Sequence, residues 1–520
     1  MPNESTFLAF MTGSRAGRRS LVDLVAALPE IYQPLFGHPE LSDRIRRPCD
    51  DRLSHVVGVC QALESTLQRP LRVLDLGCAQ GYFSLALAAR GAIVEGIDFQ
   101  AANIAVCQAL AAEHPDFDVD FRTARIEDVL PYLRADRYDL VLGLSVFHHA
   151  VHLYGCATVQ QMLGVLAEAA GIGVFELARA TEPLDWARSQ PQDPRQLLDS
   201  FAFVHELAQT GTHLSSITRP LFFTSNKYWF LDGQMGRFDT WQSESHSLSQ
   251  DASRGTRRYF FGEGRVVKHY WLNNDAHREA NSAEYLNEVA FLRAPPPGLQ
   301  VPLLSISNRD DRAAWLVREQ LPGELLIDRI QAGRPYNADS ILRDVLHQVV
   351  LLESAGLYHN DVRTWNILIG PDGRATLIDF GAISGDRNDC AWPRNLFLAF
   401  MIFTHEVLSG HVTPLDPLRP PAFNPDIHPE PYRSGFWDLL ELPMSDWTFA
   451  FLQQRVLPAP RRERGDRNTG LASVFHVMEE AFKVYQDTAD RWRSLANVSI
   501  NAIQQLNAPA AGMVASDSGR

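Results

Sequence analysis

Three polar side chains in the second half of the chain have the types and the spacing that phosphoryl transfer requires. Asp361 ends the stretch His-Asn-Asp, Asn366 follows five residues later, and Asp379 begins the tripeptide Asp-Phe-Gly. Transfer of a phosphate from ATP to a hydroxyl needs a carboxylate that accepts the hydroxyl proton and oxygen ligands that hold magnesium against the phosphates. We therefore predict Asp361 as the catalytic base and Asn366 and Asp379 as the Mg²⁺ ligands.

Two short strands must position these side chains. Residues 367–369 and 375–378 are apolar, and the turn signal Pro-Asp-Gly at residues 371–373 joins them. In kinase-like folds a hairpin of this kind separates the catalytic loop from the metal-binding aspartate. The alternative is an ordinary hairpin with scattered surface polar residues, which would require both motifs to occur together by chance.

Residues further upstream complete the predicted ATP site. Lys268 ends a strand–turn–strand pattern over residues 257–268, where a lysine reaches the ATP phosphates. Glu288 lies in a helical pattern over residues 283–292 and is the expected ion-pair partner of Lys268. The alternative for Glu288 is an exposed charge on a helix surface.

The segment over residues 315–323 resembles a strand that enters the adenine-binding hinge, where we place Glu319 and Leu321 as ATP-binding residues. No Ala-Pro-Glu motif and no long phosphorylatable loop follow Asp379. This absence argues against a regulated protein kinase and favours a sugar kinase or a small-molecule kinase. The glycine loop is incomplete, with only Gly262 and Gly264, which is the one feature that favours an inactive kinase scaffold.

A second set of residues, in the first half of the chain, predicts a cofactor site. An apolar strand precedes a turn that contains Gly77 and Gly81, and this spacing after an acidic strand suits S-adenosylmethionine better than a dinucleotide. Asp98 ends the next strand, where its carboxylate can bind both ribose hydroxyls. Arg125 and Ile126 follow at the next strand end, where adenine is usually held. The alternative is a generic Rossmann turn.

Two histidines follow the buried strand predicted over residues 138–144. His148 and His149 lie beside the expected position of the methyl group, and we predict them as a candidate methyl-acceptor site. The alternative is that both rings only fill the wall of the cleft.

Composition limits the function classes. The chain has 520 residues, enough for about three domains, and its net charge of −14 makes a nucleic-acid partner unexpected. Six cysteines show no metal-binding spacing and are expected to be reduced thiols of a cytoplasmic protein. No apolar run approaches the length of a membrane span.

We predict a multidomain α/β plus α+β protein with a class I (Rossmann-like) methyltransferase domain, a protein-kinase-like bilobal domain and a C-terminal helix with a short coiled-coil pattern. The predicted segments are a disordered leader (1–20), the methyltransferase (21–232), a polar serine-rich linker (233–253), the kinase-like domain (254–460), the helix (469–507) and a disordered tail (508–520). Apolar residues of the helix recur at four-three spacing. The helix therefore either pairs in a homo-oligomer or packs on its own kinase lobe.

Motifs in both halves together resemble one family. LPEIYQ, FGHPE, LDLGCAQG, GIDFQ, GLSVFHH, RRYFFGE and LIDFG occur in the order found in the WbdD-type bifunctional O-antigen chain terminators, over roughly residues 21–410. In that family the kinase phosphorylates the terminal mannose of a lipopolysaccharide O-polysaccharide, and the methyltransferase then methylates that phosphate. The resemblance implies an enzyme that uses S-adenosylmethionine, ATP and Mg²⁺ and terminates chain elongation.

The resemblance also implies contacts and partners. It implies S-adenosylmethionine contacts at Tyr32, Gln33, Arg52, Gly77, Asp98, Asn103, Arg125 and Ile126, to which we add Leu144. It implies a polysaccharide acceptor on a lipid carrier, a mannosyltransferase or polymerase as protein partner, and a peripheral position on the inner membrane. The family typically carries a long coiled coil after the kinase, whereas the pattern here covers about five heptads.

Two other functions remain open on the sequence. The chain could phosphorylate and methylate a small metabolite, and turnover of small alcohols would favour that function. It could instead be a methyltransferase with an inactive kinase scaffold, against which the complete set of predicted kinase residues argues.

Overall fold

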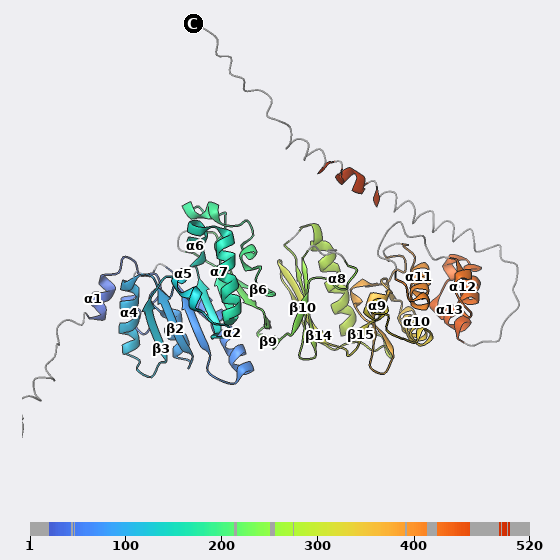
Figure 1. The fold of residues 1–520 in the computed structure, drawn as a ribbon, viewed down its shortest axis with the longest axis horizontal. Coiled ribbons are helices and arrows are strands. Elements are labelled where there is room, and N and C mark those ends of the chain that lie inside the picture. Colours follow the sequence, from blue (N-terminus) through green and yellow to red (C-terminus); the bar gives the residue numbers. More distant parts are fainter. Residues whose placement is uncertain are drawn as a thin grey trace, which may run out of the picture. The chain divides into compact units, whose positions relative to one another are not determined.

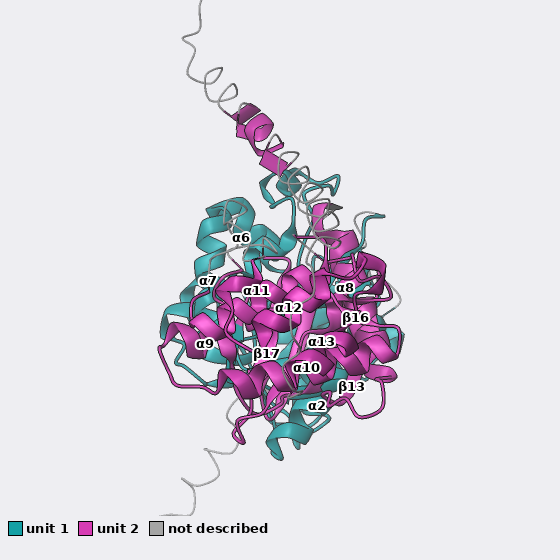
Figure 2. Cartoon of the chain, turned by 90° about the vertical axis from the view of Figure 1, so that its right-hand side faces the viewer, with its two compact units in different colours: residues 1–241 teal, residues 242–520 magenta. Residues whose placement is uncertain are grey.

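The computed structural model describes residues 20–42, 45, 47–212, 216–249, 255–273, 275–390, 393–412, 424–457, 488–489, 491–496 and 498–499. It divides the chain into two compact units, Met1–Trp241 and Gln242–Arg520 (Figure 2). The division falls inside the stretch predicted as a linker, and two short strands, β9 (Gln234–Arg237) and β10 (Thr240–Gln242), lie in that stretch.

Several predicted segments lie outside the described residues. These are the leader except Ser20, the tail, and most of the C-terminal helix, whose described residues between 488 and 499 are helical. Within the part of the chain that the structure describes, no helix is both long enough and apolar enough to cross a membrane.

The first unit is built on a seven-stranded sheet in the order β3-β2-β1-β4-β5-β7-β6 (Figure 1). The first five strands are parallel, and β7 pairs antiparallel with both β5 and β6. This parallel sheet confirms the predicted Rossmann-like class. The strands are β1 (Arg72–Leu76), β2 (Ile93–Asp98), β3 (Val119–Thr123), β4 (Tyr138–Leu144), β5 (Ala170–Glu176), β6 (Phe203–Thr210) and β7 (Arg219–Ser225).

Helices cover both faces of this sheet, as the apolar composition of its strands requires. One buried cluster packs α6 and α7 against the strands, and another joins α1, α3 and α4 (Figure 1). A separate two-stranded ribbon pairs β8 (Tyr228–Leu231) with β9. The helices are α1 (Leu21–Ala26), α2 (Asp50–Leu67), α3 (Tyr82–Ala88), α4 (Ala101–Ala112), α5 (Ile126–Val129), α6 (Phe147–Tyr154) and α7 (Cys156–Ala169).

The carboxylate of Asp139, on β4, ties that strand to β1. It accepts hydrogen bonds from both terminal nitrogens of Arg69 at 2.7 Å and from the Arg72 backbone at 2.8 Å. Burial opposes ionisation, but the hydrogen bonds from Arg69 and Arg72 prevail and lower the pKa of Asp139 to about 2. The stability from this pairing is therefore present above the unfolded pKa of about 3.9 and is lost as the pH falls toward the folded pKa.

We expect the Asp139→Asn variant to lose the part of the pH dependence of stability that comes from the ionisation of Asp139. Between about pH 4 and pH 2 its free energy of unfolding should fall less than that of the wild-type protein, because asparagine does not titrate. Urea unfolding followed by circular dichroism measures the difference. An equal fall in the two proteins would contradict the assigned role of Asp139.

The first part of the second unit is a sheet on which the helix α8 (Asp275–Arg293) packs. The sheet has five strands in the order β10-β11-β12-β14-β13, and its edge strand β10 spans the division between the two units. The strand–turn–strand predicted over residues 257–268 is confirmed as two antiparallel strands. The helical pattern at residues 283–292 is confirmed as the end of α8. The remaining strands of this sheet are β11 (Arg257–Gly262), β12 (Arg265–Trp271), β13 (Leu304–Arg309) and β14 (Ala313–Glu319).

The rest of the second unit is mainly helical around one large buried cluster. The predicted hairpin is confirmed, with β17 and β18 paired antiparallel and β15 added at the edge. Elements of this part are β15 (Glu324–Leu325), β16 (Tyr358–His359), β17 (Ile367–Ile369), β18 (Ala375–Leu377), β19 (Ile383–Ser384), α9 (Leu326–Gln331), α10 (Ala338–Ser354), α11 (Leu396–Ser409), α12 (Tyr432–Leu440) and α13 (Phe449–Val456).

Candidate functional site

The turn after β1 requires glycine at position 77, because of its backbone conformation and because Val146 packs closely against it. The φ of Gly77 is +69°, and a Cβ at this position would lie 2.3 Å from Cγ1 of Val146. The backbone N–H of Gly77 donates to Ile97 at the end of β2, 2.8 Å away, which holds the turn against the neighbouring strand. A tight glycine turn after the first strand is typical of nucleotide-binding βαβ units.

Asp98 lies beside this turn at the carboxyl end of β2. One of its oxygens accepts from the Ala79 backbone at 3.1 Å, and the other accepts from the Gln100 backbone at 2.8 Å and from Asn103 Nδ2 at 3.2 Å. Burial raises the pKa of Asp98, and these hydrogen bonds oppose that rise. The carboxylate is therefore held in one orientation at the position where a ribose is bound in this fold.

The segment before α2 is attached to the same turn through Gln80. Its side-chain oxygen accepts from the backbone N–H groups of Tyr32 and Gln33 at 3.1 and 3.0 Å. Its amide nitrogen donates to Asn103 Oδ1 at 2.8 Å. Four residues predicted to contact S-adenosylmethionine, namely Tyr32, Gln33, Asp98 and Asn103, are thus joined through Gln80, which was not predicted as a site residue.

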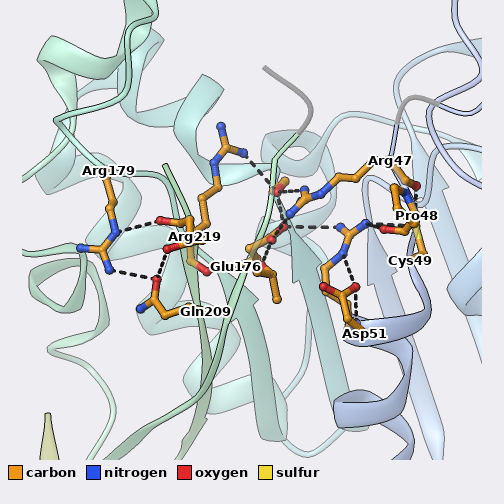
Figure 3. Close-up of polar contacts among 12 residues, drawn as sticks. Arg47, Pro48, Cys49, Asp51, Glu176, Arg179, Gln209 and Arg219 are labelled. Atoms are coloured by element: carbon orange, nitrogen blue, oxygen red, sulfur yellow. Dashed lines mark hydrogen bonds and ion pairs between the residues drawn. The ribbon is translucent and has the colours of Figure 1, made fainter. Parts of the chain in front are cut away.

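The carboxylate of Glu176, at the carboxyl end of β5, is surrounded by polar side chains (Figure 3). Glu176 is only 1% exposed and accepts hydrogen bonds from Arg47, Ser145 and Thr210, while Arg52 Nη1 lies 3.5 Å away. Burial raises the pKa of this carboxyl, but the charges of the two arginines outweigh burial and keep the pKa below its usual range. An acidic residue at the end of an otherwise apolar strand was the signal that could have identified it.

A second buried ion pair lies next to this cluster. Arg219 donates to Glu182 through Nε at 2.9 Å and through Nη2 at 2.7 Å, and its Nη1 donates to Ser145 at 3.2 Å. The guanidinium also lies 5.1 Å from the ring centre of Trp186. Arg219 and Glu182 are 37 residues apart, so no local motif indicated the pair.

The two predicted histidines lie on α6 beside Trp186. The His148 ring is 4.0 Å from that of His149 and 4.4 Å from that of Trp186. Burial, with smaller contributions from the charges of His149 and Arg219, lowers the pKa of His148 to about 2, so its ring is neutral. His148 is 8% exposed, and its Nδ1 has no hydrogen-bond partner among the described residues.

The other predicted cofactor residues are spread around this edge of the sheet. Leu144 is buried at the end of β4, next to Ser145. Arg52 is buried on α2 and donates to the Pro48 carbonyl at 3.3 Å. Arg125 is exposed, with its guanidinium 5.9 Å from the Phe99 ring, and Ile126 begins α5. The structure therefore joins Arg52 to this edge through Glu176, but it leaves Arg125 at the surface.

The second unit contains a cavity of about 350 Å³ between its sheet and its helical part. Four predicted residues line it, namely Lys268, Leu321, Asn366 and Asp379. Glu319, predicted to bind ATP, is not among the described lining residues; its side chain is exposed and accepts from the Leu303 backbone at 3.3 Å.

Lys268 is the central charge of this cavity. Its Nζ donates to Glu288 and to Asp379, each at 2.6 Å. Burial opposes the charge, but the two carboxylates raise the pKa of Lys268 above its usual value. The lysine charge in turn lowers the pKa of Asp379 to about 2, although burial opposes this. The predicted pair of Lys268 and Glu288 is present. Nε of Arg318, which was not predicted as a site residue, lies 3.5 Å from Oε1 of Glu288.

The loop predicted to be catalytic is held by hydrogen bonds around Asp361. Its Oδ2 accepts from Asn366 Nδ2 at 2.6 Å and from Trp365 Nε1 at 3.1 Å. His359 Nε2 donates to the carbonyl of Ile378 at 3.0 Å, which ties this loop to the residue before Asp379. The three residues predicted for phosphoryl transfer are therefore connected by a continuous set of contacts.

The oxygen atoms of Asn366 and Asp379 fit Mg²⁺, which takes one or two carboxylates and completes its shell with phosphates and water. Among the described residues, no group of three or more histidine, cysteine, aspartate or glutamate side chains suits a metal ion. Asn366 and Asp379 line the same cavity, so they remain the predicted candidates for holding magnesium beside a nucleotide.

Comparison with known proteins shows similarity over both units. A family model described as a methyltransferase domain matches residues 73–169. Two curated relatives from Escherichia coli, each named O-antigen chain terminator bifunctional methyltransferase/kinase WbdD, are 39% identical over 458 residues, which is 86% of this chain and 65% of theirs. The chain therefore spans 65% of the length of those relatives.

Solved structures extend this similarity to the fold. The 2.2 Å crystal structure of WbdD is 36% identical with a TM-score of 0.75 and covers 89% of this chain and 100% of its own. A low-resolution WbdD structure with an ordered C-terminal bundle is 37% identical with a TM-score of 0.81 and covers 94% and 100%. The chain belongs to the family of WbdD-type bifunctional methyltransferase/kinases.

Proposed function

We propose that the chain phosphorylates the non-reducing terminal sugar, a mannose, of a lipopolysaccharide O-antigen and then methylates that phosphate, which terminates elongation. The observation that carries this proposal is the contact of Lys268 with both Glu288 and Asp379 beside the Asp361–Asn366 pair, on the same chain as the Asp98 site. The names of the WbdD relatives support the same pair of activities.

The second unit supports a protein-kinase-like bilobal domain. Its five-stranded sheet with α8 has the composition of an amino-terminal kinase lobe, and its helical part with the β17–β18 hairpin has that of a carboxy-terminal lobe. In kinases the paired lysine and glutamate of the first lobe and the aspartate of Asp-Phe-Gly must meet at the phosphates. The 2.6 Å contacts of Lys268 meet that requirement.

For phosphoryl transfer, Asp361 accepts the proton of the attacking sugar hydroxyl. Its hydrogen bonds with Trp365 and Asn366 fix the carboxylate before the substrate arrives. Lys268 would donate to the phosphate oxygens of ATP, and Asn366 and Asp379 would hold Mg²⁺. Bound magnesium supplies positive charge that offsets the charge developing on the phosphates.

For methyl transfer, the substrate itself provides the nucleophile. A phosphate monoester has a second pKa of about 6, so it is largely dianionic at neutral pH. The site then needs positioning more than a strong base, which agrees with a neutral His148. Asp98 would bind the ribose hydroxyls of S-adenosylmethionine, Arg52 would contact the same cofactor, and His148 with His149 would line the acceptor side.

The proposed acceptor is the polysaccharide on its lipid carrier at the cytoplasmic face of the inner membrane. The proposed protein partners are the mannosyltransferase or polymerase that builds the chain and, through the C-terminal helix, further copies of this protein. A net charge of −14 supports the absence of a nucleic-acid partner.

Mass spectrometry of a short synthetic mannan tests the proposal. With ATP and Mg²⁺ alone we expect addition of one phosphate, and with S-adenosylmethionine added as well we expect one further methyl group. A methyl group added without ATP would contradict the serial order. Turnover of small alcohols with no reaction on several glycans would instead support a small-molecule substrate.

A further inference from the structure

The segment over residues 242–249, predicted as part of a linker, lies against the cavity of the second unit. Gln242 and Ser245 line this cavity together with Lys268 and Asp379. A polar, serine-rich connection would be expected to lie in solvent, where it would touch no site residue. Here the segment instead supplies two side chains to the wall of the nucleotide cavity.

His246 connects this segment to the catalytic loop. Its ring stacks on Trp365, with 4.7 Å between ring centres and 10° between ring planes. Trp365 is 5% exposed and donates its indole N–H to Asp361 Oδ2 at 3.1 Å. One stacked ring therefore separates His246 from the carboxylate that accepts the substrate proton.

Hydrogen bonds hold the histidine ring and its segment in place. The backbone N–H of Leu248 donates to Nδ1 of His246 at 3.2 Å, which makes Nδ1 an acceptor. The Ser247 hydroxyl donates to Gln331 at the end of α9, 3.0 Å away, and Ser249 donates to Glu244 within the segment. Burial lowers the pKa of His246, and the charges of Asp361 and Asp379 oppose this change.

We propose that residues 242–249 form one wall of the ATP site and that His246 is a positioning residue, which holds the Trp365 indole and through it the Asp361 carboxylate. The inference rests on the proposed kinase activity. Without the His246 ring, one face of the Trp365 indole would be uncovered. The indole could then tilt, and its hydrogen bond to Asp361 could change in length or break. The flat histidine ring on that face restricts the tilt, so the carboxylate stays aligned with the hydroxyl.

Kinetics of two His246 variants in the full chain test the proposal. With Mg²⁺·ATP and a mannan acceptor, we expect His246→Ala to lower kcat between about 10-fold and 100-fold, the cost of a misplaced catalytic group. The KM for ATP should stay near the wild-type value, because His246 is not itself among the residues that line the cavity. His246→Phe keeps a flat ring and should recover most of kcat. The matched control is His347→Ala, at an exposed position on α10.

Three results would overturn the inference. They are a wild-type kcat in His246→Ala, a defect confined to the KM for ATP, and a His246→Phe variant as slow as His246→Ala.

If the wild-type protein transferred no phosphate, this result would count against the proposed function. The role of His246 in holding Trp365 would then be tested by a second measurement. That readout is the indole N–H resonance of Trp365, identified with Trp365→Phe. We expect His246→Ala to shift this resonance and His347→Ala to leave it in place. An unshifted resonance in His246→Ala would show that His246 does not hold Trp365.

Discussion

The Asp361→Asn variant should lose phosphoryl transfer by about 10²- to 10⁴-fold, the contribution of a general base. Asparagine has nearly the shape of aspartate and can still accept a hydrogen bond from Trp365 or Asn366, but it cannot take the proton of the sugar hydroxyl. Transfer of labelled phosphate from ATP to a mannan measures the loss. The control is Asp372→Asn, which removes an exposed carboxylate from the turn between β17 and β18.

The same variant separates the two proposed activities. On an unphosphorylated glycan, Asp361→Asn should also lose methylation, because no phosphate is made for the second step. On a chemically phosphorylated mannan, methylation should continue at the wild-type rate, since Asp98 and its neighbours are unchanged. Methylation of the unphosphorylated glycan by this variant would refute the serial order, even if phosphoryl transfer were lost as expected.

Replacement of Glu176 should destabilise the first unit by about 3–5 kcal/mol, the cost of breaking a buried ion pair by removing one partner. Glu176→Ala leaves Arg47 and Arg52 buried without their carboxylate, together with the hydroxyls of Ser145 and Thr210. Hydrogen exchange followed by mass spectrometry should show faster exchange in β4 and β5, by more than about 100-fold where exchange requires unfolding of the unit.

The control for this experiment is Glu168→Ala, which removes an exposed carboxylate from α7, the helix that precedes β5. Its exchange should match that of the wild-type protein. We also expect Glu176→Ala to weaken binding of S-adenosylmethionine, since Arg52 would no longer be held by Glu176. Wild-type exchange rates in β4 of Glu176→Ala would show that the cluster does not support the sheet edge.

The sequence alone identified those functional groups that lie close together along the chain. Asp361 and Asn366 are five residues apart and bond directly, because one loop carries both. The hairpin of β17 and β18 followed from apolar segments around a Pro-Asp-Gly turn. Likewise, the alternation of apolar strands and glycine turns was sufficient to predict the parallel sheet of the first unit, since such strands are buried on both faces.

Only the tertiary structure decided which distant polar groups meet. Glu176 and Arg47 are 129 residues apart, and His246 meets Trp365 from a segment whose composition predicted a linker. Periodicity reports which face of an element is buried, but it carries no information on the partner of a buried charge. Strand order places the ends of β4, β5 and β6 together, which brings Ser145 and Thr210 to Glu176. The cost of leaving a buried charge unpaired then requires a cation beside the carboxylate, and Arg47 supplies it from a segment outside the sheet.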